Sequence, residues 1–370
     1  MSDNASSGAG ISAGSDARGR AGDGASDRTA GRASDRARPT MLQVAKLAGV
    51  SLKTASRVLN GEPYVSQRTA AKVHAAADQL GFRLNVIARE LRVGARSSTV
   101  GLIISDVANP FYARIARGVE RRLRAAGLQL ITASSDEDPE LERQLAAEML
   151  ERRVRALLLT SCVADHGYLE SERRLGIPVA FLDRPPSGIV ADTVAIDNQA
   201  GARQAAEHLI AHGHRRIGLI GDLSRLTTHR ERISGFRAAM TAAGIDNWER
   251  FVRADSHDSE AAESAARDLL ALRTAPTALF TTNNRITIGA LRAMRDHASP
   301  PALVGFDDFD LADLLGITVI AHAPERMGEI GADLVLARLA GNEAPAHQER
   351  LPTELIARGS GERRPGRRSR

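Results

Sequence analysis

The chain has 370 residues, of which 43% are hydrophobic, and a net charge of +5. This is enough material for two or three domains with packed cores. The single cysteine, Cys162, excludes a disulfide framework within the chain and a cysteine-rich zinc site. The sequence has no N-terminal apolar run of signal-peptide type and no apolar stretch of about 18 residues, so we expect a cytoplasmic protein with no membrane partner.

The charge is distributed unevenly along the chain. Residues 40–96 carry a net charge of +6 and residues 358–370 carry +5, whereas residues 97–357 carry −7. A basic region can neutralise nucleic-acid phosphates, and an acidic region is repelled by them. The pattern predicts nucleic-acid binding by the N-terminal region and not by the body of the protein.

Both ends of the chain are poor in large apolar side chains. Residues 1–39 consist mainly of Gly, Ser, Ala, Asp and Arg, which cannot bury enough surface to offset the entropy cost of ordering. We therefore predict a disordered N-terminal tail. Residues 358–370, RGSGERRPGRRSR, are interpreted as a basic disordered tail, and they lack the apolar heptads of a coiled coil.

Residues 40–84 predict an all-α domain of three short helices. Thr40 and Ser51 occupy positions where a side-chain oxygen can cap the first and the second helix. Gly49 lies between these helices, where a left-handed residue is needed to end the first one. The third helix is predicted over residues 66–80. Two short helices joined by a glycine turn indicate a helix-turn-helix.

The second of these helices has two different faces. Ala55 and Val58 share an apolar face, and Lys53 and Arg57, which are four residues apart, share a cationic one. Such a helix suits the major groove of DNA, although a merely solvated charged face is the alternative. The candidate DNA-contacting residues in this domain are Thr40, Ser51, Leu52, Lys53, Thr54, Arg57 and Asn60.

From residue 98 onward, short apolar runs alternate with amphipathic stretches. This alternation predicts parallel β-sheets that are covered by helices on both faces. Strands are predicted over residues 99–104, 128–133, 156–160, 178–182, 193–196, 216–220, 278–282 and 302–306. Helices are predicted over residues 112–126, 138–151, 199–212, 230–243, 258–272 and 286–297. We expect two similar halves with a ligand cleft between them, at the carboxyl ends of the strands.

The whole series of motifs resembles one family. VAKLAGVSLKTASRVLNG is similar to the head-piece signature of the lactose-repressor (LacI/GalR) family of bacterial transcription regulators. The similarity continues through NVIARELR, GLII, NPFY and GFDD to LPTEL, and it covers roughly residues 40–357. The resemblance implies an N-terminal all-α helix-turn-helix head-piece and an α/β periplasmic-binding-protein-like core of two parallel-sheet subdomains.

The resemblance also implies where the parts begin and end. A hinge helix and linker would occupy residues 85–97, and an effector-binding and dimerisation core residues 98–357. The first subdomain would comprise about 98–196 plus 324–345. The second would comprise about 197–321 plus 347–357.

Eight residues, 85–92, are too few to form a stable helix alone in water. From the residues alone, this segment would fold on its twin in a dimer, on DNA, or as a linker helix packed on the next domain. The resemblance implies two hinge helices in the minor groove, with Leu91 as a wedge between base pairs. It also implies that Ala88 permits close approach, and Asn85 is the candidate cap.

The loops that follow strands carry the candidate effector-binding groups. Phe111 and Tyr112 stand out because only 3% of the residues are aromatic, and they would either pack between the halves or stack on a ligand. Arg232 could grip hydroxyls or a carboxylate with its planar fork, or be an ordinary exposed arginine. The residues that the resemblance assigns to effector binding are Asn109, Phe111, Tyr112, Asp183, Arg184, Arg232 and Asn284.

The sequence departs from the family pattern at two positions. Most relatives have an aspartate where Asn284 stands; asparagine accepts at one atom and donates at the other, so an anionic ligand would meet less repulsion. Arg155 replaces a common aspartate, and no physical reason for it is evident. Asp307, in the GFDD motif, is expected at a structural strand end.

Enzyme chemistry finds no support in the sequence. There is no P-loop, no GxGxxG after a strand and no HExxH, so we expect neither catalysis nor a cofactor. His208 and His212 can share a helix face, but a helix-end pair is the more common arrangement than a metal site. We predict no metal.

The sequence therefore predicts a homodimeric, nucleoid-associated repressor that binds double-stranded operator DNA. Its operator affinity would be controlled by a small metabolite, a sugar or sugar derivative, in the core cleft. A corepressor-dependent regulator is the alternative within the family. A solute-binding protein would account for the cleft but leave residues 40–92 without a use.

Overall fold

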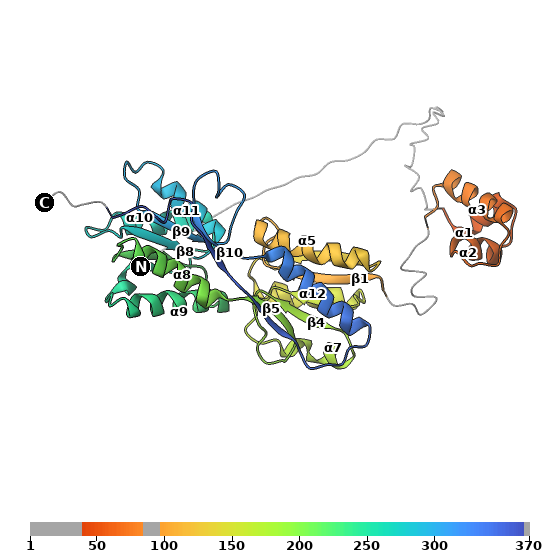
Figure 1. Ribbon diagram of the computed structural model, residues 1–370. Helices are drawn as coiled ribbons and strands as arrows, with labels where there is room; N and C mark the ends of the chain where they lie inside the picture. Colours follow the sequence, from red (N-terminus) through yellow and green to blue (C-terminus); the bar gives the residue numbers. More distant parts are fainter. Residues whose placement is uncertain (1–38, 84–96, 366–370) are drawn as a thin grey trace, which may run out of the picture. The chain divides into compact units, whose positions relative to one another are not determined.

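The computed structural model describes residues 39–83 and 97–365, which divide into a small helical unit and a large α/β unit (Figure 1). We refer to residues 39–83 as the head and to residues 97–365 as the core. The predictions for Asn85, Ala88 and Leu91 lie outside the described residues.

The head consists of the three predicted helices, which are α1 (Met41–Ala48), α2 (Leu52–Leu59) and α3 (Gln67–Leu80). Gly49 follows α1 with φ 66°, the left-handed conformation that the sequence predicted. The three helices enclose a small apolar core to which each contributes. Its buried members are Val44, Ala45, Ala55, Val58, Val73, Ala76 and Ala77.

Two six-stranded sheets form the framework of the core. The first sheet has the order β11-β5-β4-β3-β1-β2, and the second has the order β12-β10-β9-β8-β6-β7. The strands of the first sheet are β1 (Thr99–Ile104), β2 (Gln129–Ser134), β3 (Leu157–Leu159), β4 (Val179–Leu182), β5 (Asp192–Ile196) and β11 (Gln348–Leu351). Those of the second are β6 (Ile217–Ile220), β7 (Val252–Arg253), β8 (Ala278–Thr281), β9 (Ala302–Phe306), β10 (Thr318–Ala321) and β12 (Glu354–Ile356).

The pairing confirms the prediction of parallel sheets, with one exception. Among the strands of residues 97–365, every pair is parallel except β10 with β12, which is antiparallel and lies at an edge. Strands β3, β4, β5, β6, β8 and β9 are buried throughout, as expected for strands that are covered on both faces.

Helices cover both sheets, and we call each sheet with its helices a half of the core. The first half contains α5 (Pro110–Ala125), α6 (Pro139–Glu151), α7 (Glu170–Arg174) and α12 (Pro324–Leu339). The second half contains α8 (Asn198–Ala211), α9 (Thr227–Ala242), α10 (Ser259–Leu270) and α11 (Asn284–Met294). Two short 3₁₀ helices, η1 (Gly167–Leu169) and η2 (Trp248–Phe251), complete the set of described helices.

Helices α5 and α12 pack against each other although they are about 200 residues apart in sequence (Figure 1). Gly118 on α5 meets the backbone of Glu325, and Gly328 on α12 meets the backbone of Ile115. A Cβ atom at either glycine would collide with the opposite backbone, so only glycine permits this close crossing.

The division of the C-terminal segment differs from the prediction. The sequence places all of residues 347–357 in the second half, but β11 pairs with β5 of the first sheet. Only β12, after Pro352 and Thr353, joins the second sheet. Strand β11 has the sequence QERL with a single buried residue, so no apolar run revealed it as a sheet edge.

The prediction of a disordered C-terminal tail is wrong for residues 358–365. Arg358 makes two hydrogen bonds to the Asp308 carboxylate, at 2.7 and 2.8 Å. Ser360 is 1% exposed; its hydroxyl donates to the carbonyl of Leu303 at 2.6 Å and accepts from the backbone N–H of Thr318 at 2.8 Å. Polar contacts hold this segment, and a count of apolar residues could not detect them.

Candidate functional site

Helix α2 presents a polar outer face on the head. Leu52, Lys53 and Arg57 are exposed on it, whereas Ala55 and Val58 are buried. Arg57 lies 3.4 Å from Glu62, an exposed ion pair that competes only weakly with another partner. The side chains on this face are free to meet a groove.

The other head residues proposed for DNA contact are engaged within the head. Thr40 forms a capping box with Gln43 at the start of α1, and the Ser51 hydroxyl accepts from the backbone N–H of Thr54 at 3.1 Å. Asn60 ends α2 and donates from Nδ2 to the hydroxyl of Ser56 at 3.2 Å. Thr40, Ser51 and Asn60 therefore shape the helix-turn-helix, and Leu52, Lys53 and Arg57 form its free face.

An enclosed polar pocket lies between the two halves of the core, at the carboxyl ends of the strands. Its lining comes equally from both halves: Ser105, Asp106, Asn109, Phe111, Tyr112, Asp183 and Arg184 from the first, and Asp222, Thr228, Arg232, His257, Asn283, Arg285 and Asp307 from the second. The cavity measures about 30 Å³. This is far smaller than a typical ligand pocket, so the halves are closed on each other.

Six of the seven predicted effector residues line this pocket. The seventh, Asn284, lies beside it and donates from Nδ2 to Oδ1 of Asn109 in the other half, at 2.9 Å. Phe111 and Tyr112 are both largely buried, and their rings meet edge to face at 4.8 Å. The ring centroids of Phe111 and His322 are also 5.3 Å apart. The aromatic pair therefore has both roles: it packs against neighbouring rings and it lines the pocket.

Arg232 forms part of the pocket floor and is not an ordinary exposed arginine. Its Nε donates to Oδ1 of Asn198 at 2.8 Å, and Nη1 donates to the carbonyl of Thr282. The guanidinium carbon lies 3.8 Å from the ring centroid of Phe306, and Nη2 lies 4.0 Å from the Asp307 carboxylate. These contacts fix the plane of the guanidinium before any ligand arrives.

Arg184 is committed to a buried ion pair. Its two terminal nitrogens donate to the Glu137 carboxylate at 2.6 and 3.0 Å, and Nη2 also donates to the hydroxyl of Tyr112 at 2.9 Å. Burial would raise the pKa of Glu137, but the charge and hydrogen bonds of Arg184 outweigh burial and hold this pKa below its ordinary value. Held by Glu137, Arg184 therefore positions Tyr112 at the wall of the pocket.

Two aspartates at the pocket have different environments. Asp307 accepts from Nε2 of His322 at 2.9 Å, and this bond with the Arg232 charge overcomes burial and lowers the pKa of Asp307. Burial instead raises the pKa of Asp183, in spite of Arg184. Asp183 has φ 67°, and its Oδ1 has no hydrogen-bond partner within the described chain. This oxygen is available to a ligand hydroxyl.

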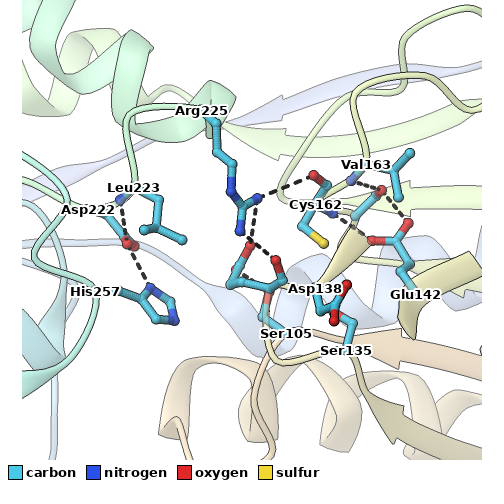
Figure 2. A network of polar contacts seen from close by, with 12 residues as sticks. Ser105, Ser135, Asp138, Glu142, Cys162, Val163, Asp222, Leu223, Arg225 and His257 are labelled. Carbon is cyan, nitrogen blue, oxygen red and sulfur yellow. Dashed lines mark hydrogen bonds and ion pairs between the residues drawn. The ribbon is translucent and has the colours of Figure 1, made fainter. Parts of the chain in front are cut away.

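Several pocket residues were not identified from the sequence, among them an aspartate–histidine pair. Nδ1 of His257 lies 2.8 Å from Oδ1 of Asp222 (Figure 2). Asn283 donates to Oδ2 of the same carboxylate at 2.9 Å. The hydrogen bond to Asp222 raises the pKa of His257, against the effect of burial.

A positional signal for the missed residues was present in the sequence. Asp106, Asp222 and Asp307 each lie one or two residues after a strand of the core. The carboxyl ends of parallel strands meet at the same edge of a sheet, so a search for polar residues at these ends would have found all three. Asp307 was wrongly expected to be only a structural strand end, since it lines the pocket.

The remaining histidine candidate is structural. His212 Nδ1 lies 2.8 Å from the carbonyl of His208, and His208 Nε2 lies 2.5 Å from the Glu362 carboxylate. Within residues 39–83 and 97–365 there is no group of three side chains suited to hold a metal ion. In the same ranges, no helix has the length and apolar content needed to cross a membrane.

A helix-turn-helix head joined to a two-half α/β core with a polar pocket defines a class of bacterial regulators. The chain belongs to the lacI family of bacterial regulatory proteins, whose model matches residues 40–85, and a periplasmic binding protein-like domain matches residues 206–361. It acts as a transcription regulator of this family.

Relatives match almost their whole length. The HTH-type transcriptional regulator DegA of Bacillus subtilis is 30% identical over 87% of this chain and 97% of its own. The ribose operon repressor of Escherichia coli is 30% identical over 87% of this chain and 99% of its own. Among solved structures, a complex of the transcriptional regulator CelR with cellobiose is 31% identical, covers 87% of this chain and 100% of its own, and has a TM-score of 0.65.

Proposed function

We propose that this protein is a homodimeric repressor that binds a near-palindromic operator and is controlled by a small neutral polyhydroxyl metabolite in the pocket between its halves. This proposal rests on the presence, in one chain, of a free cationic helix face on the head and a closed polar pocket in the core. It acts by binding rather than by catalysis. We infer that it works in the cytoplasm on the nucleoid.

The DNA contact is assigned to α2, with Leu52, Lys53 and Arg57 at base edges. Thr40, Ser51, Thr54 and Asn60 support this helix or reach phosphates through their polar groups. Asn85, Ala88 and Leu91 keep the role that the family resemblance implies, in a hinge helix that enters the minor groove. This combination would give base specificity from the head and DNA bending from the hinge.

The balance of charge favours a neutral effector. Four aspartates line the pocket, and three arginines and one histidine oppose them. Arg184 is paired with Glu137, Arg232 with Asp307 and Arg285 with Asp106, so each arginine of the lining already faces a carboxylate. The side chain of Asn284 is bonded to Asn109, so its lack of charge does not create an anion site. Ribose and cellobiose in the names of two relatives are neutral sugars.

Apolar side chains exposed on the core support the dimer. They come from the loop after β1, from the edge strand β2, from α11 and from the loop after β9, and they are Val107, Ile131, Ile288, Leu311, Leu314 and Leu315. Two ion pairs join the halves near these side chains. Val107 follows Asp106 of the Arg285–Asp106 pair, and Ile288 lies one helical turn after Arg285. Leu311 follows Asp310 of the Arg114–Asp310 pair. We infer that a second copy of the chain covers these side chains in the dimer.

The test begins with selection of a preferred sequence from random duplexes by purified full-length protein. Binding to that site is then measured by fluorescence anisotropy with and without individual sugars and sugar phosphates. We expect a near-palindromic site and release by a neutral sugar. Tighter operator binding in the presence of the sugar would establish a corepressor instead, and the absence of any sequence preference would refute the proposal.

A further inference from the structure

The pocket has a buried floor and a partly exposed rim. At the floor, the side chains of Arg232 and Asp307 are each 8% exposed. At the rim, the side chains of Arg285 and Asp106 are 35% and 22% exposed, and that of Arg225 is 43% exposed. The floor lies close to a segment where the chain crosses between the halves, since Arg232 holds Asn198, the first residue of α8, two residues after the end of β5.

Two arginines of the second half reach across this rim. Arg225 donates from Nη2 to the carbonyl of Glu137. From Nη1 it donates to the carbonyl of Cys162, a bond drawn as a dashed line in Figure 2. Arg285, at the start of α11, forms an ion pair with Asp106 in the loop after β1. We call these two arginines with their acceptors the rim clamp.

The acceptor side of the rim clamp is fixed before the halves meet. The Glu142 carboxylate accepts from the hydroxyl of Ser161 at 2.5 Å and from the backbone N–H of Cys162 at 2.7 Å, which orients the carbonyl that Arg225 uses (Figure 2). Asp106 accepts from the N–H of Ala108 at 2.7 Å with one oxygen and faces Arg285 with the other. Preformed acceptors reduce the entropy cost of closure.

A cavity of about 30 Å³ must open to admit a ligand. Opening about the crossing segments separates the rim more than the floor, so it breaks the contacts of Arg225 and Arg285. We propose that the rim clamp holds the halves closed, and that Arg225 and Arg285 are positioning residues that set how long the effector of the proposed function is retained. The statement about effector retention rests on the proposed function. Closure by the rim clamp does not, since it requires neither effector nor operator.

The two arms of the clamp should respond differently to salt. The Arg285–Asp106 pair joins two opposite charges near the surface, so added salt weakens it by screening. Arg225 donates to two neutral carbonyls, and these bonds depend less on ionic strength. It also lies 3.8 Å from the buried Glu137 carboxylate, and salt screens a partly buried pair less than one at the surface. Added salt is therefore expected to weaken the Arg285 arm more than the Arg225 arm.

The experiment measures the separation of the halves directly. Full-length dimers are spin-labelled on one protomer at Gln144→Cys and Ser264→Cys, in a Cys162→Ser background, and distances are recorded by pulsed electron paramagnetic resonance. Arg285→Gln and Arg225→Gln are each expected to add a longer-distance population. Arg267→Gln, which removes an ion pair with Glu263 inside the second half, is the control and should change nothing. Thermal unfolding shows that each variant is folded.

An exchange of charges distinguishes the loss of a direct Arg285–Asp106 ion pair from a general disturbance of the structure. The double variant Asp106→Arg with Arg285→Asp should restore the wild-type distance distribution, whereas each single reversal should open the core. Unchanged distances in both glutamine variants, or failure of the exchange to restore closure, would overturn the proposal. Loss of DNA binding or of effector response leaves these distances unaffected, so failure of the proposed function is recognised separately.

Discussion

Asn284 on α11 donates a hydrogen bond from Nδ2 to Oδ1 of Asn109, the residue that caps α5 in the other half of the core, over 2.9 Å. The same oxygen of Asn109 accepts from the backbone N–H of Phe111 at 3.0 Å. An aspartate at position 284 would bring a second acceptor against Asn109, with no proton between the two. The departure from the family pattern therefore permits this contact between the halves.

The first prediction concerns that contact. Asn284→Asp should lose the hydrogen bond and place two acceptors together in a buried site, which costs roughly 1–3 kcal/mol of the closed form. Effector affinity measured by calorimetry should fall about tenfold or more. Asn342→Asp, on an exposed turn where the side chain acts as an acceptor, is the matched control. Equal affinities in the two variants would contradict the argument.

The second prediction concerns the free face of α2. Lys53→Ala or Arg57→Ala should each cost about 1–3 kcal/mol on the preferred operator and relax the base preference. The measurement compares the operator with scrambled duplexes at fixed salt. Lys46→Ala, on the exposed side of α1, tests a cation outside this face. If Lys53 and Arg57 variants lost the same affinity on every sequence, these side chains would contact phosphates and not bases.

The third prediction uses Arg232 as the group that grips the effector. Arg232→Lys keeps the charge, but an ammonium cannot donate in the plane that joins Asn198 and Thr282. We expect operator affinity to be retained and the response to effector to be lost, which gives a permanently repressing protein. Anisotropy with the operator measures whether operator affinity is retained, and calorimetry with the effector measures whether effector binding is lost. A variant that binds effector as the wild type does would remove Arg232 from the site.

The fourth prediction is a pH dependence at the C-terminal segment. The hydrogen bonds of Arg358 lower the pKa of Asp308, so this pair stabilises the fold above the unfolded-state pKa of the carboxyl and the stabilisation is lost as pH falls through the folded-state value. Arg358→Ala should cost roughly 0.5–1.5 kcal/mol at neutral pH, allowing for partial exposure, and the loss should shrink in acid. Denaturant unfolding at several pH values measures it.

The control for this pH experiment is Arg364→Ala, a neighbouring arginine on the exposed surface of the same segment. It should leave stability almost unchanged at every pH. If Arg358→Ala were equally harmless, residues 358–365 would contribute nothing to the fold, as the composition of this segment suggested.

Local patterns predicted the head and most of the core. Thr40, Ser51 and Gly49 mark helix ends through their own chemistry, and buried strands such as β1 and β9 read as apolar runs. The family resemblance led to Arg232, which lies within α9, where a general pattern would not have found it. Each of these signals lies within a few residues of the feature that it predicts.

Features that depend on contacts between distant residues were missed. In the sequence, Arg225 looks like an ordinary loop arginine and Arg285 like an ordinary arginine at a helix end. Their acceptors come from the other half of the core, so no local pattern reveals them. Strand β11 is polar, and its pairing with β5 decides its place. Ser360 is buried although its neighbours are glycines and charged residues. In each case the three-dimensional partner, and not the local sequence, determines the structure.

The close crossing of α5 and α12 constrains how the chain can fold while it is being synthesised on the ribosome. The first half starts at β1, yet its helix α12 and its edge strand β11 come from residues 324–351. A nascent chain that has emerged only as far as β5 therefore exposes the face of α5 that Gly328 will cover. The first half cannot finish folding before nearly the whole chain, including the second half, has left the exit tunnel.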